Sequence, residues 1–445
     1  MGLRVSRSNL TWLIGLCLLA RAIPAQAVPA FAMQTGQPCA ACHVGAFGPQ
    51  LKPYGRDFKM NGYVASASSK FRLPIAISGW MSLTHTDKAQ PGAAAPHFAS
   101  NNNLALDQVS VYYAGRITQD VGAFIQVTYD GIADQAQADN ADIRYANGDG
   151  ELFDQDMVWG IDANNNPTVS DVWNSVPAWG FPYNGSALVP EPAASAVVDG
   201  ALGQRVAGLG AYIDWNDLVY LETDLYRGLG YDVLNATGEV PVTGADRVEG
   251  VVPYGRVALE QQVGRSYFEL GGYGLHASID PGGGFADDRL DHYTDLAADA
   301  NYQFILNPRS VTSDMLSAHA TYIHESGQLD ASSDLLGIDP NHNVEEFRAD
   351  VSYSVASTWT PTVQYFQAHG NTDNTAWGTP NGSPNSDGYI AELAYVPWGK
   401  PDSPFSWGNL RLAVQYVGYL RFNGTSVHAS DNNDVYFSVW AAAYF

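Results

Sequence analysis

The chain has 445 residues, and charged residues make up only 15% of them, against roughly 25% in typical soluble proteins. Glycine accounts for 44 residues and aromatic residues for 12%, while 22 Lys and Arg face 46 Asp and Glu, which gives a formal charge of −24. This composition argues against an ordinary cytosolic enzyme and, because the chain is strongly acidic, against nucleic acid as a partner.

Residues 1–27 have the features of a secretory signal peptide. Arg4 and Arg7 form a basic start, an apolar run follows from residue 12 to residue 20, and Ala25-Gln26-Ala27 is a typical cleavage site. The apolar run is too short to span a bilayer, and no later stretch offers roughly 18 consecutive apolar residues. We therefore expect an exported mature protein without a membrane helix.

Residues 39–43 read Cys-Ala-Ala-Cys-His, the C-x-x-C-H pattern of covalent c-type haem attachment. On one turn, Cys39 and Cys42 can each bond a haem vinyl group, which brings the adjacent His43 to the iron as proximal ligand. A redox dithiol would not need the histidine, and a zinc site would need more Cys or His before Lys70, which the segment lacks. The pattern therefore predicts one covalent haem c.

The distal haem ligand is a separate question, because methionine opposite histidine raises the reduction potential. Residues 49–61 predict a short helix, and Met60 lies off its apolar stripe, so Met60 is the first distal candidate. Met33, in a stretch that we expect to be extended, is the alternative. A ligand elsewhere, with His319 as the first barrel histidine to test, and an open site remain as further alternatives.

Beyond residue 70, short segments with period-2 alternation and intervening turn residues indicate a transmembrane β-barrel. In residues 435–445, for example, apolar side chains occupy every second position and the chain ends on Phe445. There is no second apolar face to fill a sandwich core, so we assign apolar side chains to lipid and polar ones to a wet lumen. We expect about sixteen antiparallel strands, near residues 72–84, 103–117, 119–130, 140–148, 154–163, 206–216, 218–228, 252–262, 265–277, 291–305, 313–325, 344–355, 358–369, 387–396, 409–422 and 434–445.

The connections between these expected strands alternate between short turns and mostly long loops. Short turns of such barrels face the periplasm, so both chain ends are expected on the periplasmic side. The longest connection, from about residue 163 to 205, is rich in Pro and Trp, which argues against strands. It is expected either to fold into the lumen or to cover the mouth.

Charge is segregated along the chain, because residues 28–70 carry a net +3 whereas residues 71–445 carry −30. A basic haem segment would be held by an acidic barrel, and some 43 residues can scarcely bury a haem unaided. We therefore expect a signal peptide (1–27), a monohaem cytochrome c segment (28–70) that plugs the lumen, and an outer-membrane porin-like β-barrel (71–445). The alternative is a small cytochrome that hangs below the barrel.

The N-terminal segment resembles the fused cytochrome-porin family of outer-membrane iron oxidases, in which a monohaem c-type cytochrome is joined to a β-barrel. The shared motifs are Pro-x-Phe-Ala at 29–32, Thr35-Gly36, the C-x-x-C-H run, and Gly-Arg-x-Phe-Lys-x-x-Gly-Tyr at 55–63. The resemblance implies that Cys39 and Cys42 hold the haem and that His43 ligates it. It also implies oxidation of extracellular Fe(II), with electrons passed to periplasmic c-type cytochromes or another carrier.

We therefore expect an electron-transfer protein in the outer membrane of a Gram-negative bacterium, in contact with lipid, with the haem segment on the periplasmic side or inside the lumen. Acidic stretches such as 134–145 and 431–434 would concentrate cations. The alternatives are a porin-like channel whose haem is structural or regulatory, and a haem barrel with a different electron donor. A haem enzyme such as a peroxidase would need an open distal site.

Overall fold

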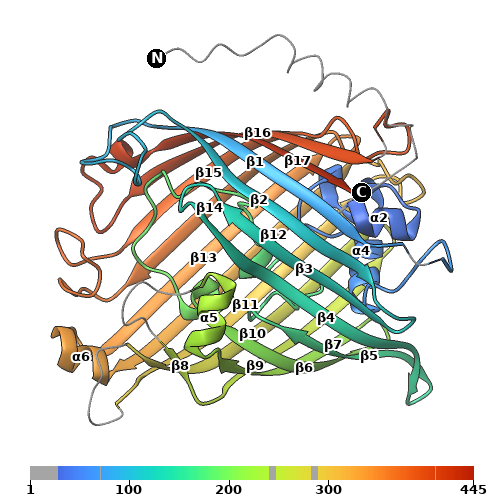
Figure 1. The fold of residues 1–445 in the computed structure, drawn as a ribbon, viewed down its shortest axis with the longest axis horizontal. Helices are drawn as coiled ribbons and strands as arrows, with labels where there is room; N and C mark the ends of the chain where they lie inside the picture. Colours follow the sequence, from blue (N-terminus) through green and yellow to red (C-terminus); the bar gives the residue numbers. More distant parts are fainter. Residues whose placement is uncertain (1–28, 71, 240–246, 282–288, 406, 445) are drawn as a thin grey trace.

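The computed structural model describes residues 29–70, 72–239, 247–281, 289–405 and 407–444, so the expected signal peptide and the terminal Phe445 lie outside the described residues. Within them, all strands belong to one antiparallel sheet that closes on itself, because β1 (Ile75–Thr86) pairs with both β2 (Asn103–Arg116) and β17 (Asp434–Tyr444) (Figure 1). The expected all-β barrel is confirmed.

Between β2 and β17 the strands follow one another in chain order. They are β3 (Val121–Asp130), β4 (Gln135–Leu152), β5 (Gln155–Asn164), β6 (Val206–Trp215), β7 (Val219–Gly228), β8 (Arg247–Glu249), β9 (Val252–Val263), β10 (Ser266–Asp280), β11 (Asp291–Ile305), β12 (Met315–Leu329), β13 (Asn341–Ser354), β14 (Trp359–Gly370), β15 (Ser386–Tyr395) and β16 (Gly408–Arg421). Both β8 and β9 pair with β10 and are separated by Gly250, whose φ of +73° turns the backbone between them. β8 and β9 are therefore two parts of one interrupted strand, and when they are counted together the barrel has sixteen strands.

Each of the sixteen expected strand ranges overlaps one of these sixteen strands. The largest differences are at the long-loop ends of the hairpins, where β4, β12 and β13 run several residues further than expected. These extensions carry polar residues on both faces, for example Asn341, His342 and Asn343 at the start of β13. Alternation of apolar and polar residues is therefore lost there, although the backbone pairing continues.

The outer surface of the barrel is apolar. On β2, exposed Leu104 and Leu106 alternate with buried Asn103, Ala105 and Asp107, so polar side chains point inward. Other strands expose large apolar side chains in the same way. They include Leu209, Leu221, Leu225, Val257, Leu259, Leu270, Leu296, Val351, Val363, Leu393 and Val414. Among the described residues, no helix is long and apolar enough to cross a membrane.

The N-terminal segment forms three short helices and a single 3₁₀ turn: α2 (Pro29–Thr35), α3 (Cys39–Cys42), η1 (Val44–Ala46) and α4 (Pro53–Met60). The helix expected over 49–61 is present in its second half. The extended stretch expected at Met33 was wrong, because residues 29–35 are helical. Pro at the first helical position together with Ala, Met and Gln favours a helix there.

This segment lies in the barrel lumen. Arg56 bonds Gln303 on β11, Asn409 on β16 donates to the Ala46 carbonyl, and the Tyr63 hydroxyl donates to Asp142 on β4. These three strands lie far apart around the ring, so the segment is held across it. Figure 1 shows α2 and α4 at one end of the barrel, with α5 (Tyr231–Thr237) and α6 (Asp330–Leu336) at the opposite end. The expected plug is observed, and the alternative of a cytochrome below the barrel is not.

The plug lies at the end of the barrel that carries the short turns. The Lys52 ammonium donates to the Val311 carbonyl in the turn after β11, and the Ala40 N–H donates to the Gly399 carbonyl in the turn after β15. The longest connection, residues 165–205, also folds inward, with only the short turns η2 (Pro177–Trp179) and η3 (Val197–Ala201). Its backbone is held by barrel carboxylates, since the consecutive N–H groups of residues 196, 197 and 198 donate to Glu346, Glu325 and Asp295.

A candidate haem site in the lumen

The three residues of the predicted haem attachment site lie together on α3 and directly after it. Cys42 and His43 line a cavity of about 400 Å³ inside the barrel. Cys39 is 1% exposed and packs with Ala46 and Phe47, which line the same cavity. The whole C-x-x-C-H turn is therefore placed at one wall of an internal cavity.

Local backbone contacts fix this turn against α4. The Cys42 carbonyl accepts a hydrogen bond from the Lys52 N–H at 2.8 Å, and His43 forms an isolated bridge with Leu51. A Cβ at Gly55 would lie 2.5 Å from the Cys42 carbonyl oxygen, so only glycine lets α4 pack this closely on the motif. The Gly55 of the shared N-terminal motif therefore has a steric role at the site.

The His43 imidazole is prepared to act as a ligand. Its Nδ1 is buried and has no hydrogen-bond partner among the described residues. Burial, and secondarily the charge of Lys52, lowers the pKa of His43 to about 4, against opposing backbone hydrogen bonds at Gly48 and Gln50. The ring is thus neutral at physiological pH, which is the form that binds a metal.

The cysteines do not have the properties of a redox pair or a zinc site. Burial raises the pKa of Cys42 to about 12, although Lys52 opposes the effect, so the thiol is protonated and unreactive. In the part of the chain that the structure describes, no set of three His, Cys, Asp or Glu ligand atoms within 4.8 Å of one another includes Cys39, Cys42 or His43. The neutral His43 ring and the adjoining cavity fit a thioether-bound haem.

The cavity walls come from the plug, from six neighbouring barrel strands and from the inward loop. Two aromatic groups dominate them. Phe31, Phe58 and Tyr63 of the plug lie 5.1–5.8 Å apart, ring centre to ring centre. The other group joins Phe47 to Trp440 and Trp440 to Trp80, at 4.8 and 5.4 Å. Flat aromatic walls of this kind suit the faces of a porphyrin.

Lys59 fastens the plug to the inward loop at the edge of this cavity. Its buried ammonium donates to the carbonyls of Val169 and Asp171, each at 2.7 Å, and to Asn174 Oδ1 at 2.8 Å. Burial, and then repulsion from Arg144, lowers the pKa of Lys59 to about 8. Lys59 and Tyr63 both belong to the motif run at 55–63, which is the sequence signal that could have identified them as site residues.

None of the three distal candidates lies at this cavity. Its lining, as far as the described residues define it, contains neither Met60 nor Met33 and no histidine besides His43. Met60 is buried in a separate cluster with Trp173 and Tyr212, whose hydroxyl donates to the Met60 carbonyl.

His319 points into the lumen as expected. Its Nδ1 lies 3.0 Å from Asp350 Oδ2, and its Nε2 lies 2.9 Å from the side-chain nitrogen of Gln50, so both ring nitrogens are engaged. The structure thus brings together Cys39, Cys42 and His43, and it places none of Met60, Met33 and His319 with them.

No family model matches this chain, and no curated protein matches it by sequence. Solved outer-membrane barrels are similar in structure. The channel DcaP of Acinetobacter baumannii has a TM-score of 0.45 at 12% identity, with 83% of this chain and 96% of that chain covered. OprB of Pseudomonas putida has a TM-score of 0.44 at 11% identity, covering 83% and 93%. OmpT of Vibrio cholerae, in a loop-deletion form, has a TM-score of 0.43 at 9% identity, covering 83% and 98%.

At such low identities and TM-scores below 0.5, these similarities transfer no residue and no activity to this chain. What the chain itself shows is the fold of an outer-membrane β-barrel, closed and apolar on its outer face, with a plug in its lumen.

Proposed function

We propose that this chain is an outer-membrane electron-transfer protein that holds one haem c inside its barrel and oxidises extracellular Fe(II). A periplasmic c-type cytochrome or another electron carrier would accept the electrons. The observation that carries the proposal is the C-x-x-C-H turn at an internal aromatic cavity, with the His43 Nδ1 buried and without a partner among the described residues.

In this proposal Cys39 and Cys42 hold the haem through thioether bonds, and His43 supplies the proximal nitrogen. A haem c supplies reversible one-electron chemistry at its iron when bound. The aromatic side chains of Phe31, Phe58 and Trp440 line the cavity and would shield part of the haem from water. A dry, low-dielectric surrounding is one of the means by which a protein sets a reduction potential.

The overall reaction balances as one electron for each ion. A ferrous ion loses one electron and leaves as a ferric ion, and one electron carrier on the other side is reduced. Short turns of outer-membrane barrels face the periplasm, so the plug, which lies at the short-turn end, would meet a periplasmic carrier. The acidic barrel would attract the cationic substrate from outside.

A second candidate function, a haem enzyme with an open distal site, is supported by one specific observation. In the described part of the chain, the cavity lining offers no methionine and no second histidine, and methionine is the usual partner of histidine in electron-transfer cytochromes c. A porin with a structural haem has less support, because the plug and the inward loop both occupy the lumen.

Anaerobic rapid mixing of the oxidised, purified protein with Fe(II) tests the proposal. The haem α-band should appear at a rate proportional to the Fe(II) concentration. If dithionite reduces the haem but Fe(II) does not, iron oxidation is refuted. Turnover of hydrogen peroxide in the same preparation would favour the enzyme instead.

A further inference from the structure

We propose that three carboxylates inside the barrel, Asp162 on β5 together with Glu222 and Asp224 on β7, bind a divalent cation through oxygen ligands. One oxygen atom of each lies within 4.8 Å of the others. The three residues are 1%, 5% and 0% exposed, respectively, so this carboxylate trio is an interior feature and not a solvated surface patch.

The strand between them leaves room for the trio. Gly210 on β6 pairs with Asp162 on one side and with Asp224 on the other. A Cβ at Gly210 would lie 2.8 Å from Asp162 Oδ1 and would clash with Asp224 Oδ1. The φ of this glycine is not in the left-handed region, so the space that it leaves is what distinguishes it from any other residue there.

Each carboxylate is positioned by a neighbour through one oxygen and leaves its other oxygen without a partner. Asn164 donates to Asp162 Oδ2 at 2.7 Å, and the Tyr220 hydroxyl donates to Glu222 Oε2 at 3.1 Å. Among the described residues, Asp162 Oδ1, Glu222 Oε1 and Asp224 Oδ2 have no hydrogen-bond partner. Three buried, unbonded carboxylate oxygens are therefore available at one place.

A separate group points to a ligand at the same place. Tyr226 is 0% exposed, and its hydroxyl has no hydrogen-bond partner in the described ranges. It follows Asp224 by two positions on β7, so both side chains leave the strand on the same face. The Tyr226 ring lies over its β6 partner Gly208, as the Asp224 carboxylate lies over its β6 partner Gly210, so the two side chains extend across β6 side by side. A bound cation with its water would satisfy this hydroxyl together with the three oxygens.

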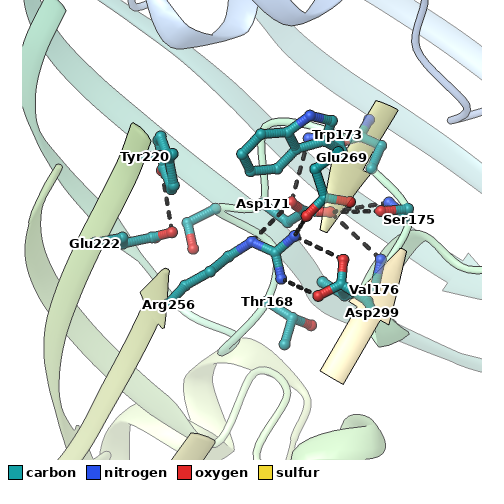
Figure 2. Close-up of polar contacts among 12 residues, drawn as sticks. Thr168, Asp171, Trp173, Ser175, Val176, Tyr220, Glu222, Arg256, Glu269 and Asp299 are labelled. Carbon is teal, nitrogen blue, oxygen red and sulfur yellow. Dashed lines mark hydrogen bonds and ion pairs between the residues drawn. The ribbon is translucent and has the colours of Figure 1, made fainter. Parts of the chain in front are cut away.

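The basic residues nearby are already paired with other acids. Arg256 lies among Asp171, Glu269 and Asp299, as Figure 2 shows, with Glu222 bonded to Tyr220 on the other side. Arg144 forms an ion pair with Asp142 at 2.9 Å.

Buried carboxylates are costly unless they are paired or coordinate a metal. The two positive charges of Arg144 and Arg256 already face four carboxylates that do not belong to the trio. Among the described residues, no Lys or Arg forms an ion pair with the trio, although Arg144 attracts Asp162 and Lys59 attracts Glu222 from further away. An all-oxygen ligand set suits a hard divalent cation such as Mn²⁺, Ca²⁺ or Fe²⁺.

The trio lies between the long-loop end of the barrel and the plug. Asp162 is two residues before the end of β5, where the chain enters the inward loop. On the other side, Tyr220 stacks on Tyr212 with ring centres 6.1 Å apart, and the Tyr212 hydroxyl donates to the Met60 carbonyl of α4 at 2.6 Å. A continuous set of contacts thus joins the site to the helix that lines the haem cavity.

The same carboxylate oxygens can bind either a ferrous ion that is the substrate or a permanently bound structural cation. The ferrous assignment rests on the proposed function, whereas the cation site itself does not. The primary test uses Mn²⁺, which is not oxidised by a haem, with the intact haem-loaded barrel after treatment with a chelator. Calorimetry and electron paramagnetic resonance should show one Mn²⁺ bound per chain.

Asp224→Asn keeps the shape and removes one ligand charge, and we expect it to weaken Mn²⁺ binding at least tenfold. Asp107→Asn is the matched control, because Asp107 is a buried lumen carboxylate on β2 outside the trio. Heat modifiability and the haem spectrum check folding of each variant, and Glu222→Gln replaces Asp224→Asn if that barrel does not fold. Equal Mn²⁺ binding by the wild type and by a folded trio variant would overturn the site.

The rate of haem reduction by Fe(II) in the same variants decides whether the site binds the substrate ion or a resident cation. Slower reduction in Asp224→Asn, with Asp107→Asn unchanged, would identify the site as a substrate site. An unchanged rate beside lost Mn²⁺ binding would identify a resident cation. If Fe(II) reduces no variant while Mn²⁺ binds the wild type, the proposed function fails and the cation site stands.

Discussion

Arg56 ties the plug to the barrel wall, and its removal should open the lumen. The side chain is 5% exposed and donates to Gln303 Oε1 on β11 at 2.9 Å. Its guanidinium also lies 3.7 Å from the ring centre of Tyr267 on β10. Substitution with Met keeps the apolar stem of the side chain and removes both interactions.

The magnitude follows from these two contacts. A hydrogen bond from a charged group contributes about 1.5–3 kcal/mol, and a desolvated cation–π contact contributes about 2 kcal/mol. Removing the buried charge also removes its desolvation cost, which leaves about 3 kcal/mol in favour of the plugged state. The ratio of open to plugged molecules should therefore rise about 150-fold in Arg56→Met.

Single-channel recording in planar bilayers measures this ratio. The wild type should show small conductance with rare openings, and the open fraction should be about 150 times larger in Arg56→Met. Arg72→Met is the control, because the same change is made at an exposed arginine just outside the plug. A wide open channel in the wild type, or an unchanged open fraction in Arg56→Met, would refute the plug as the element that closes the lumen.

Three further predictions concern the haem site. His43→Ala should abolish the spectrum of a histidine-ligated haem and leave a heat-modifiable barrel; an unchanged spectrum would remove His43 as the ligand. Met60→Leu should leave the reduction potential unchanged, because Met60 does not line the cavity, and a lowered potential measured by redox titration would make Met60 the distal ligand after all. The proximal ligation should persist from about pH 8 down to about pH 5, because the pKa of His43 is lowered to about 4 and protonation competes only below that range; loss of the histidine-ligated haem spectrum near pH 6.5 would show an exposed imidazole.

The barrel could be predicted from the sequence because its strands and turns are determined by residues that are close together in the chain. Alternating side chains on opposite faces of a strand, as at 435–445, and turns between them carry the information within a few residues. The charge contrast between residues 28–70 and the barrel predicted the plug for the same reason, since it depends only on composition. The C-x-x-C-H turn is likewise a contiguous motif.

The remaining features depend on residues that are distant in sequence. The inward path of residues 165–205 is set by Glu346, Glu325 and Asp295 on three separate strands, and no local pattern encodes that pairing. The carboxylate trio is similar, because Asp162 and Asp224 meet only through the register of β5, β6 and β7. A sequence can show that each residue faces the lumen, but not which strands it meets there.

The distal side of the haem illustrates the same limit. Met60 was a reasonable candidate on helical phase alone, because it lies off the apolar stripe of α4. Its environment is decided by Tyr212 and Trp173, which come from β6 and from the inward loop. These contacts turn Met60 towards a second cluster and away from the cavity lining.

The most direct test of the account is whether the purified chain carries a covalently bound haem at Cys39 and Cys42. Mass spectrometry of the denatured mature protein, combined with its pyridine haemochrome spectrum, measures this. We predict one haem per chain that remains attached after denaturation and is lost from a Cys39→Ser, Cys42→Ser double variant. A haem-free chain from cells that mature c-type cytochromes, or a haem released by denaturation, would contradict the account.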